Sequence, residues 1–212
     1  MMRYHSFADL PETLPVFPLS GVLLLPRSAL PLNVFEPRYL AMVDQALKTD
    51  RLIGMIQPLE NEETVRTPRL TQVGCAGQIV SWRETEDNRY LITLSGICRF
   101  GVTREVSSAP YRVLACDFSA FAGDLVEGPS PDFPREQLLA ALKNYLAGRD
   151  MKADWKSVMT APAKSLVNAL SMMCPFEPAE KQALLEAPSL DARLSTLVAL
   201  LQLSTPHAGT LN

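Results

Sequence analysis

A run of residues that break regular structure divides the sequence into two halves of different character. Residues 122–134 contain two glycines and three prolines. Glycine lacks a Cβ and proline lacks an N–H donor, so neither a helix nor a strand continues easily through such a run. We therefore predict a linker over 122–134, between a β domain over 1–121 and a helical domain over 135–204. The last residues, 205–212, are expected to form a loose tail.

The first half has the alternation that is typical of strands. Tyr90, Ile92 and Leu94 alternate with side chains of the opposite face, a period of two that predicts a strand after the turn signal Glu86–Asp87–Asn88. Gly96 is expected to end this strand. Several such strands, closely spaced by turns, favour an antiparallel barrel or a strongly bent sheet.

One helix is predicted to interrupt these strands. Pro37 suits the first helical position, where its missing N–H has no hydrogen bond to lose. Leu40, Val43 and Leu47 follow at helical spacing and form the expected apolar stripe.

The second half shows the period of amphipathic helices. Thr160 is expected to cap a helix whose apolar stripe runs from Leu166 to Met173. A short helix is predicted over residues 178–186, and Ser189 is a good N-cap for the last helix. Short connections between such helices favour a compact bundle.

The composition argues against several classes of protein. The net charge is −3 and 47% of the residues are hydrophobic, values typical of a globular chain, and this overall charge weighs against nucleic-acid binding, although a local basic patch is compatible with it. The four cysteines contain no C-x-x-C pair, which indicates free thiols in a reducing compartment. The two histidines, His5 and His207, lie near opposite ends, so we expect neither a metal site nor a cofactor.

Motifs of catalysis and of membrane insertion are also missing from the sequence. There is no phosphate-binding G-x-x-x-x-G-K-[ST] and no G-x-S-x-G nucleophile elbow. Lys156–Ser157 and Lys164–Ser165 are adjacent pairs, and neighbours on a helix point about 100° apart, so neither pair forms a dyad on one face. No segment has the roughly 20 apolar residues of a membrane span, and the N-terminus has no apolar signal region. We therefore expect a soluble cytoplasmic protein that is not an enzyme.

One segment carries a family resemblance. It begins Leu14-Pro-Val-Phe-Pro-Leu19 and continues Leu30-Pro-Leu-Asn-Val-Phe-Glu-Pro-Arg-Tyr39. This pattern closely resembles the opening of the N-terminal domain of Lon-type ATP-dependent proteases. Further pieces match in the same order along nearly the whole chain: Gly54, Val73–Gly74, Gly96-x-x-Arg99-Phe100, Lys181–Glu186 and Arg193–Leu194.

The resemblance implies an α+β fold. It would consist of a PUA-like β pseudo-barrel, mostly antiparallel and interrupted by one helix, followed by a C-terminal α-helical bundle. The implied function is a non-catalytic module that binds unfolded or extended polypeptide, because the sequence holds neither the ATPase nor the peptidase domain of a Lon protease. Two alternatives remain open: an RNA-binding PUA-like protein, and an adaptor or regulator of a full-length Lon-type protease.

Candidate binding residues cluster where the predicted helix begins, and each also has a purely structural interpretation. Glu36 would be stabilised at the positive end of the helix, and Arg38 would pair with a nearby acid. Phe17 and Phe35 are expected in the core because each lies in an apolar run. Arg99 is interpreted as a partner of Glu36 or as a cation on a sheet edge. The candidate residues are Phe35, Glu36, Arg38, Tyr39 and Arg99.

Overall fold

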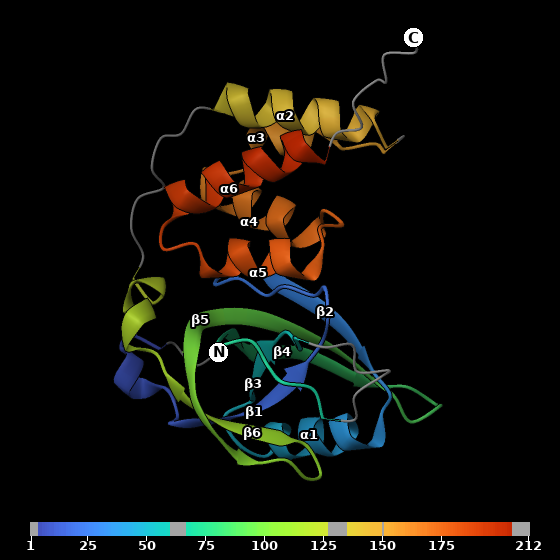
Figure 1. The fold of residues 1–212 in the computed structure, drawn as a ribbon. Helices are drawn as coiled ribbons and strands as arrows, with labels where there is room; N and C mark the ends of the chain where they lie inside the picture. The colour runs from blue at the N-terminus through green and yellow to red at the C-terminus, as the bar shows by residue number, and fades with distance from the viewer. Residues whose placement is uncertain (1–3, 60–66, 127–134, 150, 205–212) are drawn as a thin grey trace. The chain divides into compact units, whose positions relative to one another are not determined.

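The computed structural model of the chain describes residues 4–59, 67–126, 135–149 and 151–204. The chain divides into two compact units, residues 1–127 and 128–212 (Figure 1). This division lies six residues beyond the predicted end of the β domain at 121. The predicted tail and residues 127–134 of the predicted linker lie outside the described residues. Among the described helices, none combines the length and the apolar character that crossing a membrane requires.

The first unit is built on one mixed sheet of six strands with the order β2-β5-β4-β3-β1-β6. β6 also pairs with β5, so the strands other than β2 form a closed ring. β1 and β3 are parallel, whereas the remaining pairs are antiparallel, as predicted for a mostly antiparallel barrel. The elements are η1 (Phe7–Asp9), β1 (Thr13–Pro18), β2 (Ala29–Val34), α1 (Pro37–Leu47), β3 (Leu52–Ile56), β4 (Val73–Glu84), β5 (Tyr90–Ser107), β6 (Arg112–Asp117) and η2 (Ser119–Asp124).

Gly96 does not end a strand, and this prediction was wrong. β5 continues through it for 18 residues and pairs with β2, β4 and β6 in turn. A Cβ at this position would overlap the carbonyl oxygen of Leu25. The glycine is therefore needed because another backbone segment lies directly against the strand.

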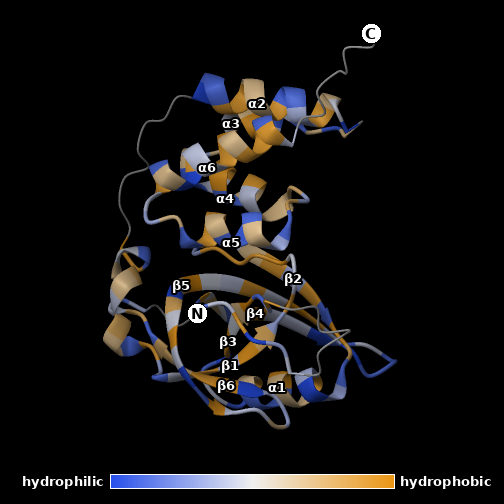
Figure 2. Ribbon diagram, in the orientation of Figure 1, coloured by the Kyte–Doolittle hydropathy of each residue, from blue (hydrophilic) through white to orange (hydrophobic). Residues whose placement is uncertain are grey.

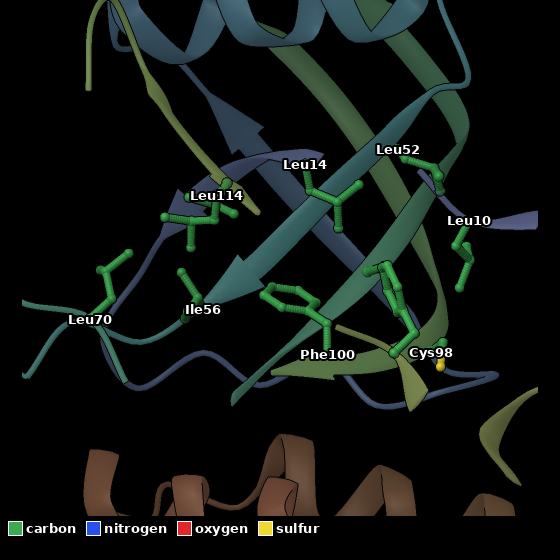
Figure 3. Packing of buried hydrophobic residues seen from close by; sticks show 11 residues of the cluster. Leu10, Leu14, Leu52, Ile56, Leu70, Cys98, Phe100 and Leu114 are labelled. Atoms are coloured by element: carbon green, nitrogen blue, oxygen red, sulfur yellow. The ribbon is translucent and has the colours of Figure 1, made fainter. Parts of the chain in front are cut away.

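The barrel interior is organised around Phe100, which is fully buried (Figure 3). Its ring packs directly against the backbone of two glycines, Gly74 in β4 and Gly54 in β3. A Cβ on Gly74 would come within 2.5 Å of the ring, and one on Gly54 within 3.0 Å. Phe118 packs edge-on against the same ring at a centroid distance of 6.1 Å. Apolar residues from five strands complete this core. They include Leu14, Val16, Leu52, Ile56, Ala76, Cys98 and Leu114.

Helix α1 begins at Pro37, as predicted. Its buried face consists of Tyr39, Met42, Val43 and Ala46. The predicted apolar stripe has only Val43 in common with this face. It began at Leu40, one residue after Tyr39, where the buried face begins. Tyr39 contributes a large apolar ring, which a strict search for aliphatic residues overlooks.

The second unit contains five helices among the described residues. The short helix over 155–160 was not predicted, and Thr160 ends it instead of capping the next helix. Met173 was expected to be buried but is 79% exposed. The helix over 178–186 and the Ser189 cap were predicted correctly. The helices are α2 (Arg135–Ala147), α3 (Trp155–Thr160), α4 (Ala163–Met173), α5 (Pro178–Glu186) and α6 (Leu190–Leu203).

Helix α6 is the centre of this unit, since α2, α4 and α5 all pack against it. Leu197 and Leu201 on α6 are fully buried, as is Leu138 on α2. Figure 2 shows hydrophobic and hydrophilic residues mixed within the helices, while the turn between β4 and β5 is hydrophilic. The buried leucines of α2 and α6 give the bundle an apolar core of its own.

Candidate functional site

Residues Phe35–Tyr39 form a tight corner between β2 and α1, and we refer to them as the FEPRY segment. Glu36 is the N-cap residue of α1, in an extended conformation. Its carboxylate pairs with Arg38, with 2.9 Å between Oε2 and Nη2 and 3.0 Å between Oε2 and Nε. Both side chains are about two-fifths exposed, at 42% and 40%. The prediction that Arg38 pairs with a nearby acid is confirmed, and that acid is Glu36.

Tyr39 anchors this corner to the barrel. Its ring is buried and lies 4.1 Å from that of Phe17 on β1, centroid to centroid. The guanidinium of Arg38 lies 4.5 Å from the centroid of the same ring, in a cation–π contact. Phe17 is buried, as predicted. The start of α1 is thus held on the end of β1 by ring packing.

Phe35 is 59% exposed, so the prediction that it lies in the core was wrong. The preceding residue, Val34, is buried at the end of β2, and successive side chains of a strand point to opposite faces. Arg89, from the turn between β4 and β5, places its guanidinium 5.7 Å from the Phe35 ring centroid. The same turn is tied to α1 by the hydroxyl of Tyr90, which donates to Asp44 at 2.8 Å. Phe35 is therefore an exposed aromatic ring on a well-anchored corner.

A small pocket opens beside the FEPRY segment, with a cavity volume of ≈ 40 Å³. Arg38 and Tyr39 contribute one wall, and Tyr111 and Arg112 contribute another. A cavity of this size holds about three water-sized groups, whereas cofactor sites usually measure about 300–1,000 Å³. The pocket therefore fits the end of one side chain or a chain terminus. Its remaining lining residues are Pro18, Thr67, Pro68, Ser108 and Pro110.

The second wall was not predicted from the sequence, because it depends on strand register. β1 and β6 are antiparallel, with Val16 opposite Arg112. This register places the start of β6 against the end of β1, where Tyr39 also packs. Arg112 is fixed there by Glu105, with Nε–Oε1 at 2.9 Å and Nη2–Oε2 at 2.7 Å. No local motif in the sequence signals this meeting of segments that lie more than 90 residues apart.

Arg99 does not belong to this site, and neither interpretation offered for it was correct. It is buried, and its guanidinium forms a two-point pair with Asp124 of η2, with Nε–Oδ2 at 2.8 Å and Nη2–Oδ1 at 3.0 Å. The main-chain N–H of Arg99 donates to the same carboxylate at 3.1 Å. Residue 124 lies in the range that was predicted to be a linker. Arg99 therefore attaches η2 to the barrel.

The cysteines have the chemistry of buried thiols. Burial raises the pKa of Cys98 and of Cys116 to about 12, and that of Cys174 to about 11. A catalytic thiol needs the opposite shift, because the thiolate is the nucleophile. Ser157, one of the serines next to a lysine, donates its hydroxyl to Asp154 at 2.6 Å and so takes part in the cap of α3. Within the described ranges, no three His, Cys, Asp or Glu side chains converge to hold a metal ion.

The fold places the chain in a class of known structures. A crystal structure of a Lon N-terminal domain protein from Xanthomonas campestris aligns with a TM-score of 0.62 and 25% identity, covering 88% of this chain and 97% of that one. The N-terminal domain of the Mycobacterium avium complex Lon protease aligns with a TM-score of 0.63 at 17% identity, covering 89% and 97%, and shows the fold alone. The chain thus has the α+β fold of Lon N-terminal domains.

The chain belongs to the family of the ATP-dependent protease La (LON) substrate-binding domain, whose model matches residues 13–202. Lon protease 2 of Myxococcus xanthus is 26% identical over 204 residues, which make up 91% of this chain and 24% of that protein. Lon protease of Anaeromyxobacter dehalogenans is 25% identical over 207 residues, or 91% and 23%. The chain therefore spans only about a quarter of the length of these curated relatives.

Proposed function

We propose that this chain is a non-catalytic module that binds unfolded or extended polypeptide through the FEPRY segment. The observation that carries the proposal is Phe35, a large apolar ring that is 59% exposed in the same segment as Arg38 and Tyr39, which line a pocket. Aromatic side chains next to a concave site supply much of the binding energy in protein interfaces. Membership of a substrate-binding family supports the proposal.

The site suits an extended chain better than a folded surface. In an extended segment, side chains point alternately to opposite sides, so those at i and i+2 face the same way. One such side chain would pack on Phe35, and another farther along the extended chain would enter the pocket. Glu36 and Arg38, both partly exposed, then form a polar rim. Addition of a strand to the edge strand β2 is less favourable, because Pro31 has no N–H to donate to a ladder.

A capture experiment tests this proposal. The immobilised full chain is exposed to a reduced, carbamidomethylated model protein that cannot fold, and separately to its folded form. We expect retention of the unfolded form only. Retention no greater than that of an inert globular control would contradict the proposal.

A matched pair of variants tests the role of Phe35. Phe35→Ser should weaken capture about tenfold, the effect of losing a buried aromatic anchor. Phe7→Ser is the control, since Phe7 is also an exposed phenylalanine of the first unit, at 47%. Equal effects of the two substitutions would show that Phe35 has no special role.

The non-catalytic part of the proposal is tested with casein and ATP. We expect no degradation by the purified chain. Degradation that disappears in Lys164→Ala would contradict the proposal, because it would reveal a working Ser-Lys pair at Lys164–Ser165.

A further inference from the structure

The polar residues that line the pocket beside the FEPRY segment share one chemical character. Arg38 and Arg112 supply two guanidinium groups, and Thr67, Ser108 and Tyr111 supply hydroxyls. The other lining residues are Tyr39 and three prolines. None of the lining residues, all of which lie in the described part of the chain, is acidic. The walls therefore offer hydrogen-bond donors, among them two guanidinium groups that are each paired with a glutamate outside the lining.

We propose that this pocket binds a carboxylate group of the captured polypeptide. The inference rests on the proposed function and adds the chemistry that the pocket selects. A carboxylate has three heavy atoms, and the cavity of ≈ 40 Å³ holds about three water-sized groups. The carboxylate comes from the C-terminus of the bound chain or from an Asp or Glu side chain, since both carry the same group.

The two arginines are held in place before a ligand arrives. Arg112 donates through both Nε and Nη2 to the carboxylate of Glu105, and through Nη1 to the carbonyl of Pro68 at 2.6 Å. Its side chain is 15% exposed. Arg38 is held by Glu36 and by the ring of Tyr39. Fixed side chains lose little conformational entropy on binding.

The glutamates reduce the positive charge of the site but do not line the pocket. The planar guanidinium matches a carboxylate in geometry as well as in charge. The pocket therefore favours a carboxylate over an uncharged amide of the same shape.

Four peptides of one flexible apolar sequence test the inference on the wild-type full chain. They carry Glu or Gln at the penultimate position and a free carboxylate or an amide at the C-terminus, and binding is followed by fluorescence anisotropy. We expect at least one carboxylate to tighten binding about tenfold, as charge-assisted hydrogen bonds do. A gain from the free C-terminus identifies a terminal ligand, and a gain from Glu identifies a side-chain ligand.

Equal binding of all four peptides, or no measurable binding of any, overturns the carboxylate inference. Capture of unfolded protein decides separately whether the proposed function survives. In variants, Arg38→Gln should remove the preference for a carboxylate, whereas Arg104→Gln should keep it. Arg104 is the matched control, because it is an exposed arginine of β5 outside the pocket lining. A preference for a carboxylate that persists in Arg38→Gln or in Arg112→Gln would also overturn the inference.

Discussion

Both units of the chain bury cations, but they give them different partners. In the barrel, Arg99 faces the carboxylate of Asp124, with side chains that are 7% and 13% exposed. In the bundle, the partners include main-chain carbonyls near the ends of helices. Lys181 donates to Met172 near the end of α4 at 3.0 Å, and Arg193 donates to Leu184 near the end of α5 at 2.8 Å.

This difference shows how buried charge can be used in two ways. The carboxyl end of a helix carries partial negative charge from unpaired carbonyls, so a cation there is stabilised without a second buried ion. At Arg99 the barrel instead uses the side-chain carboxylate of Asp124, the last residue of η2, and so meets the cation with a full charge. Loss of the cation should therefore leave a buried carboxylate in the barrel, but neutral carbonyl groups in the bundle.

The two tryptophans make the comparison measurable. Trp82 lies in β4 of the barrel and Trp155 in α3 of the bundle, and the chain has no others. Both are partly exposed, at 46% and 40%, so replacement by Phe should change the free energy of unfolding by less than about 0.5 kcal/mol. A Trp155→Phe background then reports on the barrel, and a Trp82→Phe background on the bundle.

The largest effect is expected for Arg99→Met. This substitution leaves Asp124 buried without its cation, so the free energy of unfolding of the barrel should fall by about 3–5 kcal/mol. Urea unfolding followed by Trp82 fluorescence measures the change. The double variant Arg99→Met/Asp124→Leu should recover a large part of the loss, because it removes both charges. A loss below about 1 kcal/mol in the single variant would show that the pair behaves like an exposed salt bridge.

A smaller effect is expected for Arg193→Met in the bundle. The groups left behind include the carbonyl of Leu184 and the amide oxygen of Asn168, both neutral. The free energy of unfolding should fall by about 1–3 kcal/mol, the usual cost of unsatisfied polar groups. Trp155 fluorescence in urea gives the value, and Lys143→Met, on the exposed face of α2, is the control. A loss as large as that of Arg99→Met would remove the distinction between the two units.

Local sequence signals predicted the elements of the fold well. Proline and serine at helix starts located Pro37 and Ser189 correctly, because capping depends on residues within one turn. The residues that carried the family resemblance also have clear structural roles. Gly54 and Gly74 make room for Phe100, and Gly96 makes room for the Leu25 backbone.

Only the part of the candidate site that one continuous segment supplies was predicted. Glu36, Arg38 and Tyr39 interact with neighbours in sequence or with the adjacent β1, so their roles followed from the segment itself. Arg112 and Asp124 reach their places through the closure of the barrel, which no short pattern encodes. Phe35 was assigned to the core because an apolar run does not reveal which side chain turns outward at the end of a strand.

The smallest expected effect concerns pH. In the barrel, burial raises the pKa of Cys98 and Cys116 to about 12 from an ordinary 9.0, so the unfolded chain loses these protons first. Stability that is present below the ordinary pKa is therefore lost as pH rises towards 12, by less than about 1.4 kcal/mol per thiol and pH unit. In the bundle, Cys174 acts in the same direction, but burial lowers the pKa of Lys181 from 10.5, which has the opposite sign.

Raising the pH from about 8 to about 10 should thus lower the urea midpoint of the barrel more than that of the bundle, each read from its own tryptophan. Cys98→Ala should flatten the pH dependence of the barrel, because it removes one of two thiols that act in the same direction. Lys181→Met should steepen that of the bundle, because it removes the group that opposes Cys174. Parallel pH profiles for the two units, unchanged by these substitutions, would mean that the buried thiols and the buried lysine do not set the difference.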